Sequence, residues 1–74
     1  MSRSELKREM IDFIKLLVKV ARLGNERPGD VDFFISVMTK KNEGETVCGL
    51  TFSDMWGIAQ RIVAIEKDTG EVWE

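Results

Sequence analysis

The chain of 74 residues contains no histidine, no tyrosine and only one cysteine. Histidine is the commonest general base and the commonest metal ligand, so its absence excludes catalytic triads, the usual zinc sites and a built-in switch near about pH 6. A single cysteine excludes an internal disulfide and fits a reducing compartment. No stretch resembles a secretory signal or a membrane span. We therefore predict a non-enzymatic, cytoplasmic protein that uses no cofactor and no metal and does not bind a membrane.

Length sets a second limit. A chain of 74 residues forms one domain, over residues 1–74, and buries only about 60 to 65% of the surface that its unfolded form exposes. The core is therefore thin and the margin of stability small.

Residues 4–23 have the spacing of an amphipathic helix, with apolar side chains at three- and four-residue steps: Leu6, Met10, Phe13, Ile14, Leu17, Val20 and Ala21. Ser4 is the expected N-cap, and Gly24 supplies the stop. Further apolar residues widen this surface well past half a turn: Ile11, Leu16, Val18 and Leu23. A small core does not cover such a surface, so the helix is either central in the fold or partly in contact with another chain.

Residues 31–52 are predicted to form a β-hairpin, because β-branched and aromatic residues dominate 31–39 and turn residues separate them from a second apolar run at 46–52. The register that gathers the apolar groups on one face sets Val37 opposite Leu50, Ile35 opposite Phe52 and Thr39 opposite Cys48. Cys48 is then a small buried residue of the second strand. The alternative is a short helix over 31–40 with Asp30 as its N-cap, which gives an all-α, three-helix chain.

Another helix is predicted over residues 54–67, with Ser53 as its N-cap and Asp54 at the positive end of its dipole. A competing interpretation makes residues 62–73 a hairpin with a tight turn before Gly70. If the helix forms, residues 70–74 are a tail. Its apolar side chains Val72 and Trp73 then need something to pack against, which the tail could find by forming a third strand beside the hairpin.

The order helix, strand, strand, helix predicts a small α+β domain with both helices on one face of the sheet. A two-stranded sheet is marginal alone and gains from a third strand or from a second subunit. Together with the surplus apolar surface of the first helix, this predicts a homodimer.

Charge is divided unevenly along the chain. Residues 1–27 carry seven basic and four acidic side chains, whereas residues 28–74 carry four basic and nine acidic ones. A basic stripe follows one side of the first helix: Arg8, Lys15, Lys19 and Arg22. Such a stripe would give salt-dependent binding to phosphates, which makes a nucleic-acid-binding accessory protein the alternative function.

Protein binding explains more of the unusual residues. Gly57 costs a helix interior about 1 kcal/mol relative to alanine, and it leaves a smooth outer face together with Gln60, Arg61 and Ala64. Trp73 places a large aromatic side chain where chains usually fray, although it could equally fold back onto the core. The leading hypothesis is a non-catalytic adaptor, regulator or inhibitor that binds another protein through these five residues.

Overall fold

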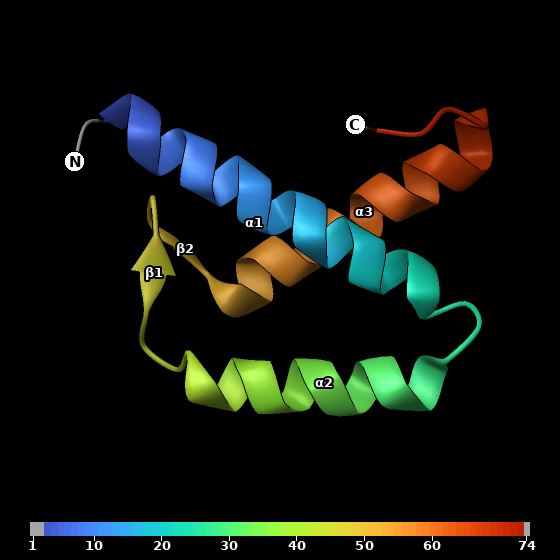
Figure 1. Ribbon diagram of the computed structural model, residues 1–74, viewed down its shortest axis with the longest axis horizontal. Coiled ribbons are helices and arrows are strands. Elements are labelled where there is room, and N and C mark those ends of the chain that lie inside the picture. The colour runs from blue at the N-terminus through green and yellow to red at the C-terminus, as the bar shows by residue number, and fades with distance from the viewer. Residues whose placement is uncertain (1–2, 74) are drawn as a thin grey trace.

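The computed structural model describes residues 3–73 and contains three helices and a short two-stranded antiparallel hairpin, in a mostly helical chain. The helices are α1 (Arg3–Leu23), α2 (Pro28–Lys41) and α3 (Phe52–Thr69), and the strands are β1 (Thr46–Val47) and β2 (Leu50–Thr51). Helix α1 lies across α3, α2 runs along one edge of the molecule, and the hairpin lies at one end (Figure 1).

Helix α1 ends at Leu23, and the Gly24 N–H donates to the carbonyl oxygens of Val20 and Ala21, both at 3.1 Å. Its other end differs from expectation. The helix already includes Arg3, so Ser4 lies in the first turn and is not the N-cap.

The predicted first strand is instead helix α2, as in the all-helical alternative. Pro28 stands at the start, where its missing N–H costs nothing, and Asp30 lies in the first turn while Lys40 and Lys41 lie in the last. These signals match the helix dipole, and they outweigh the strand propensity of residues 31–39. The expected N-cap Asp30 is inside the helix, because the N-cap position is Arg27.

Helical spacing also explains which side of α2 faces inward. Val31 is buried, and Ile35 and Met38, four and seven residues later, pack against the core. The Thr39 hydroxyl donates to the carbonyl oxygen of Ile35 at 2.7 Å, which satisfies this polar group within the helix. The predicted cross-strand pairs of Ile35, Val37 and Thr39 therefore do not form.

The hairpin is smaller than predicted and lies later in the chain. Thr46 pairs with Thr51 and Val47 with Leu50, around a two-residue turn of Cys48 and Gly49. Both turn residues have positive φ, 52° and 79°, as a type I′ hairpin requires. Cys48 is exposed in this turn, so the prediction of a buried strand cysteine was wrong.

Helix α3 begins earlier than predicted. Its N-cap is Thr51 rather than Ser53: the Thr51 hydroxyl accepts from the Asp54 N–H at 3.2 Å, and the Asp54 carboxylate accepts from the Thr51 N–H at 3.0 Å. This reciprocal pair is a capping box, and the hydrogen bond from the Thr51 N–H lowers the pKa of Asp54.

The other end of α3 decides between the two interpretations of residues 62–73. The helix continues to Thr69, and Gly70 ends it in a left-handed conformation with φ 76°, its N–H donating to the Glu66 carbonyl oxygen at 2.8 Å. Residues 71–73 form no strand, so the expected third strand is not present in the described part of the chain.

The core lies where α1 crosses α3. It consists of buried side chains from these two helices: Ile14, Leu17, Val18, Phe52, Met55, Ala59 and Val63. Ala59 is fully buried, and its small side chain allows the helices to approach closely. At the hairpin end Phe13 packs edge-on against Phe52, with ring centroids 6.0 Å apart.

The molecule is a thin slab with Cα extents of 36 × 28 × 13 Å. Its radius of gyration is 12.8 Å, compared with about 11 Å for a compact chain of this length. Its accessible surface is 5654 Å², whereas a compact monomer of this mass exposes about 4,650 Å². The shape therefore leaves about 1,000 Å² of surplus surface. Within residues 3–73 no helix is long and apolar enough to cross a membrane.

The capping box gives a test of where α3 begins. Thr51→Ala removes the oxygen that accepts from the Asp54 N–H, so it should destabilise the protein by about 1 kcal/mol in urea unfolding. Ser53→Ala is the matched control, because Ser53 is exposed and is not the cap; it should change the unfolding free energy by only a few tenths of that amount. A larger loss from Ser53→Ala would contradict the assignment.

Candidate protein-binding surfaces

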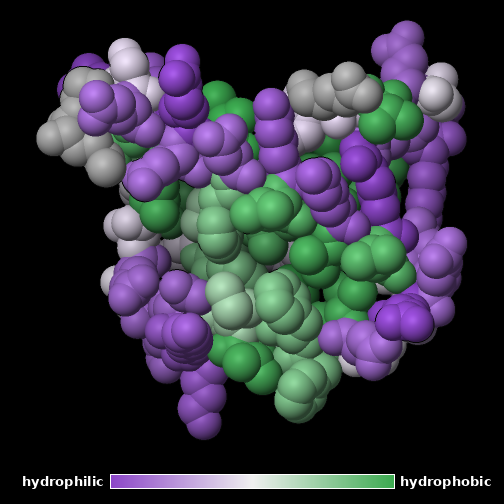
Figure 2. All heavy atoms as spheres, viewed as in Figure 1, coloured by the Kyte–Doolittle hydropathy of each residue, from purple (hydrophilic) through white to green (hydrophobic). Residues whose placement is uncertain are grey.

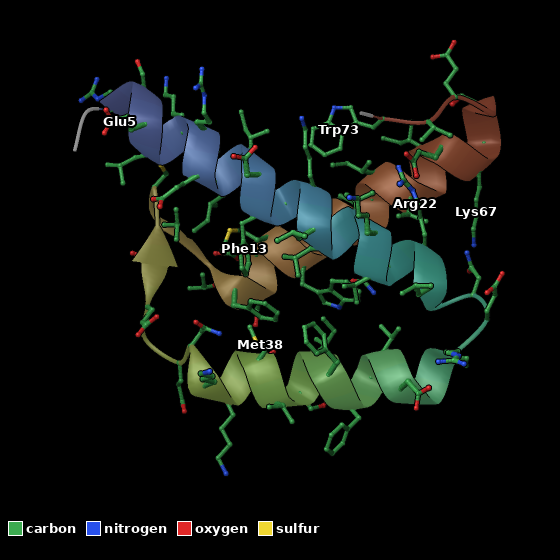
Figure 3. All side chains as sticks on the ribbon, viewed as in Figure 1. Glu5, Phe13, Arg22, Met38, Lys67 and Trp73 are labelled. Atoms are coloured by element: carbon green, nitrogen blue, oxygen red, sulfur yellow. The ribbon has the colours of Figure 1, made fainter. Side chains whose placement is uncertain are left out.

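The C-terminal tail folds back onto the molecule. The Trp73 N–H donates to Glu66 Oε2 at 2.7 Å, and the Trp73 carbonyl oxygen accepts from Arg22 Nη2 at 3.2 Å. The Lys15 Nζ lies over the indole, 5.8 Å from its ring centroid, in cation–π geometry. Figure 3 shows Trp73 beside α1 and near Arg22. Trp73 therefore contacts helices α1 and α3 of its own chain, in line with the alternative that it folds back onto the domain.

One ion pair joins α1, α3 and the tail. Arg22 donates to Glu66 through two nitrogens, with Nε 3.0 Å from Oε1 and Nη2 2.5 Å from Oε2. The guanidinium of Arg22 and the N–H of Trp73 hold the pKa of Glu66 below its ordinary value, because both donate to the charged form. The fork geometry also fixes the direction in which the tail leaves α3.

The basic stripe of α1 is partly occupied by these contacts. Lys15 lies over Trp73, and Arg22 is bonded to Glu66, so two of its four members interact with the C-terminal part of the chain. Arg8 and Lys19 are exposed. Because the charge of Arg22 is already paired with Glu66, the stripe offers one fewer cation to phosphates than the sequence implies, which weighs against the nucleic-acid alternative.

The structure keeps four of the five predicted protein-binding residues on one side of α3. Gln60, Arg61 and Ala64 are exposed, and Gly57 is half-buried one turn earlier. Gln60 and Ala64 line a cleft of about 320 Å³ between α3, the end of α1 and the start of α2, whose other walls are Ala21, Gly24, Asn25, Pro28, Val31, Asp32, Trp56, Val63 and Lys67. Trp73 is not part of this cleft; with Ile62 and Glu66 it lines a different hollow.

Gly57 makes room for no other element of the chain. Apart from its two chain neighbours and the adjacent backbone of α3, a Cβ atom at this position would meet no atom within 4 Å, and the residue does not have positive φ. Neither sterics nor backbone conformation in the isolated chain therefore requires glycine here.

A second surface, formed by residues of α1 and α2, was missed by the sequence analysis. Phe33, Phe34 and Val37 are exposed on α2, at 73%, 42% and 48%, and Leu23 of α1 is 53% exposed. Phe34 and Leu23 line a shallow hollow of about 250 Å³ with Val20, Arg27, Asp30 and Val31. We call half-buried Val20 and the exposed apolar residues Leu23, Phe33, Phe34 and Val37 the α1–α2 face. Figure 2 shows hydrophobic residues gathered over the region between these helices, with hydrophilic residues around them.

A signal for the α1–α2 face was present in the sequence. Leu23 lies outside the main apolar stripe of the first helix. Phe33 and Val37 fall on one side of α2 when 31–40 is interpreted as a helix, with Phe34 about 100° away around the helix axis. Because residues 31–39 were interpreted as a strand, Phe33 and Phe34 were not expected to lie near Leu23.

The chain matches no known protein family, no curated protein and no solved structure. No relative therefore lends it a function, and its surfaces have to be interpreted from their own chemistry. Among residues 3–73 no cluster of three or more cysteine, aspartate or glutamate side chains has the arrangement that a metal ion needs.

Gly57 gives a second prediction. Gly57→Ala should stabilise the protein by about 1 kcal/mol in urea unfolding, since alanine is the better helix former and the new methyl group meets no atom of another element. A destabilised variant would show that the isolated chain itself requires glycine here.

Acid should release the tail. The pKa of Glu66 is lowered from its ordinary value of 4.5 in the folded state, so its contribution is complete above that value and is lost as the pH falls through the lowered pKa. In a Trp56→Phe background, Trp73 fluorescence should shift to the red over this range, and Glu66→Gln should show the shifted emission already at neutral pH. Glu71→Gln, an exposed neighbour on the same tail, should behave like the parent. A parent whose emission does not change on acidification would refute the role of Glu66.

Proposed function

We propose that this chain is a non-catalytic protein-binding protein, an adaptor, regulator or inhibitor, which binds its target through the cleft beside Gln60 and Ala64. The observation that carries the proposal is the cleft itself, because Gln60 and Ala64, two of the four residues that the sequence marks as a smooth outer face, line it. Its volume of about 320 Å³ lies at the lower end of the range for binding pockets. A cleft of this size accepts one large side chain of a partner rather than a whole ligand.

The lining of the cleft suits such an anchor. Val31 and Val63 are buried and Trp56 is half-buried, so the interior is apolar. Polar groups surround it, and the Lys67 Nζ donates to Asn25 Oδ1 at 2.6 Å, which ties α3 to the loop after α1. An apolar centre within a polar rim is typical of the positions that supply most of the energy of protein–protein binding.

The neighbouring surface favours a close and charge-steered approach. Gly57 presents no side chain, so a partner backbone or helix can come nearer to α3 than at any other residue type. Residues 28–74, which include both α2 and α3, carry an excess of acidic groups. The target is therefore expected to present a basic surface, which would accelerate association more than it would raise affinity.

A photo-crosslinking experiment tests the proposal. A photoreactive residue at Gln60, used in extract of the native host, should crosslink a specific target protein, and Ala64→Arg in the same chain should reduce the yield at least tenfold, since it places a long charged side chain at the cleft. Ser4→Arg is the matched control: it adds the same side chain to an exposed site at the far end of α1 and should leave the crosslink unchanged.

Two results would contradict the proposal. Crosslinks that are insensitive to Ala64→Arg would place the target elsewhere. Salt-sensitive binding of a labelled duplex or single strand, abolished by Lys19→Glu together with Arg8→Glu, would favour the nucleic-acid alternative instead.

A further inference from the structure

We infer that the α1–α2 face is covered by a second copy of this chain in a two-fold symmetric dimer. This inference goes beyond target binding and concerns a different surface. The cleft at Gln60 lies between α3, the end of α1 and the start of α2, whereas the hollow of the α1–α2 face has no lining residue from α3. Buried Val31 is the only residue that lines both.

The exposed side chains on this face are of the kind that interfaces bury. Phe33 is 73% exposed, more than any other large apolar residue in the described chain, and Val37 follows four residues later on the same side of α2. Phe34 continues this surface toward Leu23 of α1, with which it shares the shallow hollow. Contiguous apolar surface of this extent on two helices marks an interaction site.

The surplus area matches what one subunit contributes to a dimer. The chain exposes 5654 Å², about 1,000 Å² more than a compact monomer of its mass. A standard stable interface takes about 800 Å² from each partner. Covering an area of this size would therefore bring the chain to the exposure of an ordinary globular protein.

The charges on the face favour a second copy over a different partner. Arg27 and Asp30 line the same hollow as Phe34 and Leu23, and they are three residues apart at the start of α2. A two-fold axis close to this hollow would set Arg27 of one subunit against Asp30 of the other, and would repeat the pair in reverse. A partner whose surface carries one sign of charge would match only one of these residues.

Charge reversal turns this symmetry into a test. In sedimentation at tens of micromolar, the wild-type chain should migrate as twice its mass of 8.5 kDa. Arg27→Asp alone gives two acidic groups on every subunit, and Asp30→Arg alone gives two basic groups, so each variant should sediment as a monomer. An equimolar mixture of the two variants should recover the dimer, because each acidic subunit then meets a basic one.

Further variants separate loss of the interface from loss of the fold. Phe33→Asp should yield a folded monomer, since the side chain that it replaces is mostly exposed, and circular dichroism should show unchanged helix content. Ile65→Asp is the matched control: Ile65 is 61% exposed but lies in α3, near the tail, so this variant should stay dimeric.

Each other outcome overturns the inference. A wild-type chain that sediments at 8.5 kDa at high micromolar concentration excludes the dimer. A dimer that survives Phe33→Asp and both charge reversals uses another face, and a mixture that stays monomeric refutes the reciprocal pairing. None of these results affects the crosslink at Gln60, which is measured on α3.

Discussion

The crossing of α1 over α3 is the contact on which the rest of this structure depends. All seven residues of the core cluster come from these two helices, and fully buried Ala59 allows their close approach. Helix α2 adds Val31 and the half-buried Ile35 and Met38, and the hairpin closes one end of the crossing. A core with one main interface cannot enclose three helices, so the chain forms a slab 13 Å deep with open broad sides. Both candidate binding surfaces are consequences of that geometry.

The two helices that pack together, α1 and α3, were predicted from the sequence, whereas helix α2 and the exact ends of the helices and strands were not. Apolar spacing marks α1 and α3 because each buries a whole stripe. Helix α2 buries only a narrow side, so the strand propensity of Phe33, Phe34 and Val37 dominated the pattern, although those side chains are exposed. Propensity is a weak guide where tertiary packing decides. The cap of α3 was missed because Ser53 and Thr51 are chemically equivalent as caps, and only the backbone path selects Thr51.

The candidate sites, like the fold, were predictable from the sequence only in part. Gly57, Gln60, Arg61 and Ala64 share a side of α3, as helical spacing predicts, but the cleft that makes this side a candidate site also needs α2, whose helical form was not the preferred interpretation. The contacts of Trp73 with Lys15 and Arg22 were not predicted, because these two residues are more than fifty residues earlier in the chain. Local sequence patterns carry no information about such pairings, which depend on how the helices cross.

The separation of the two core helices along the chain has a consequence for synthesis. Residues 24–51 lie between α1 and α3, so the stripe of α1 lacks its main partner until α3 has left the ribosome. During that interval Ile14, Leu17 and Val18 are exposed to water, on a helix that short-range contacts alone stabilise poorly. Folding is then a late event that joins distant parts of the chain. Until it occurs, the exposed apolar side chains of α1 can bind a chaperone or a neighbouring nascent copy instead of α3.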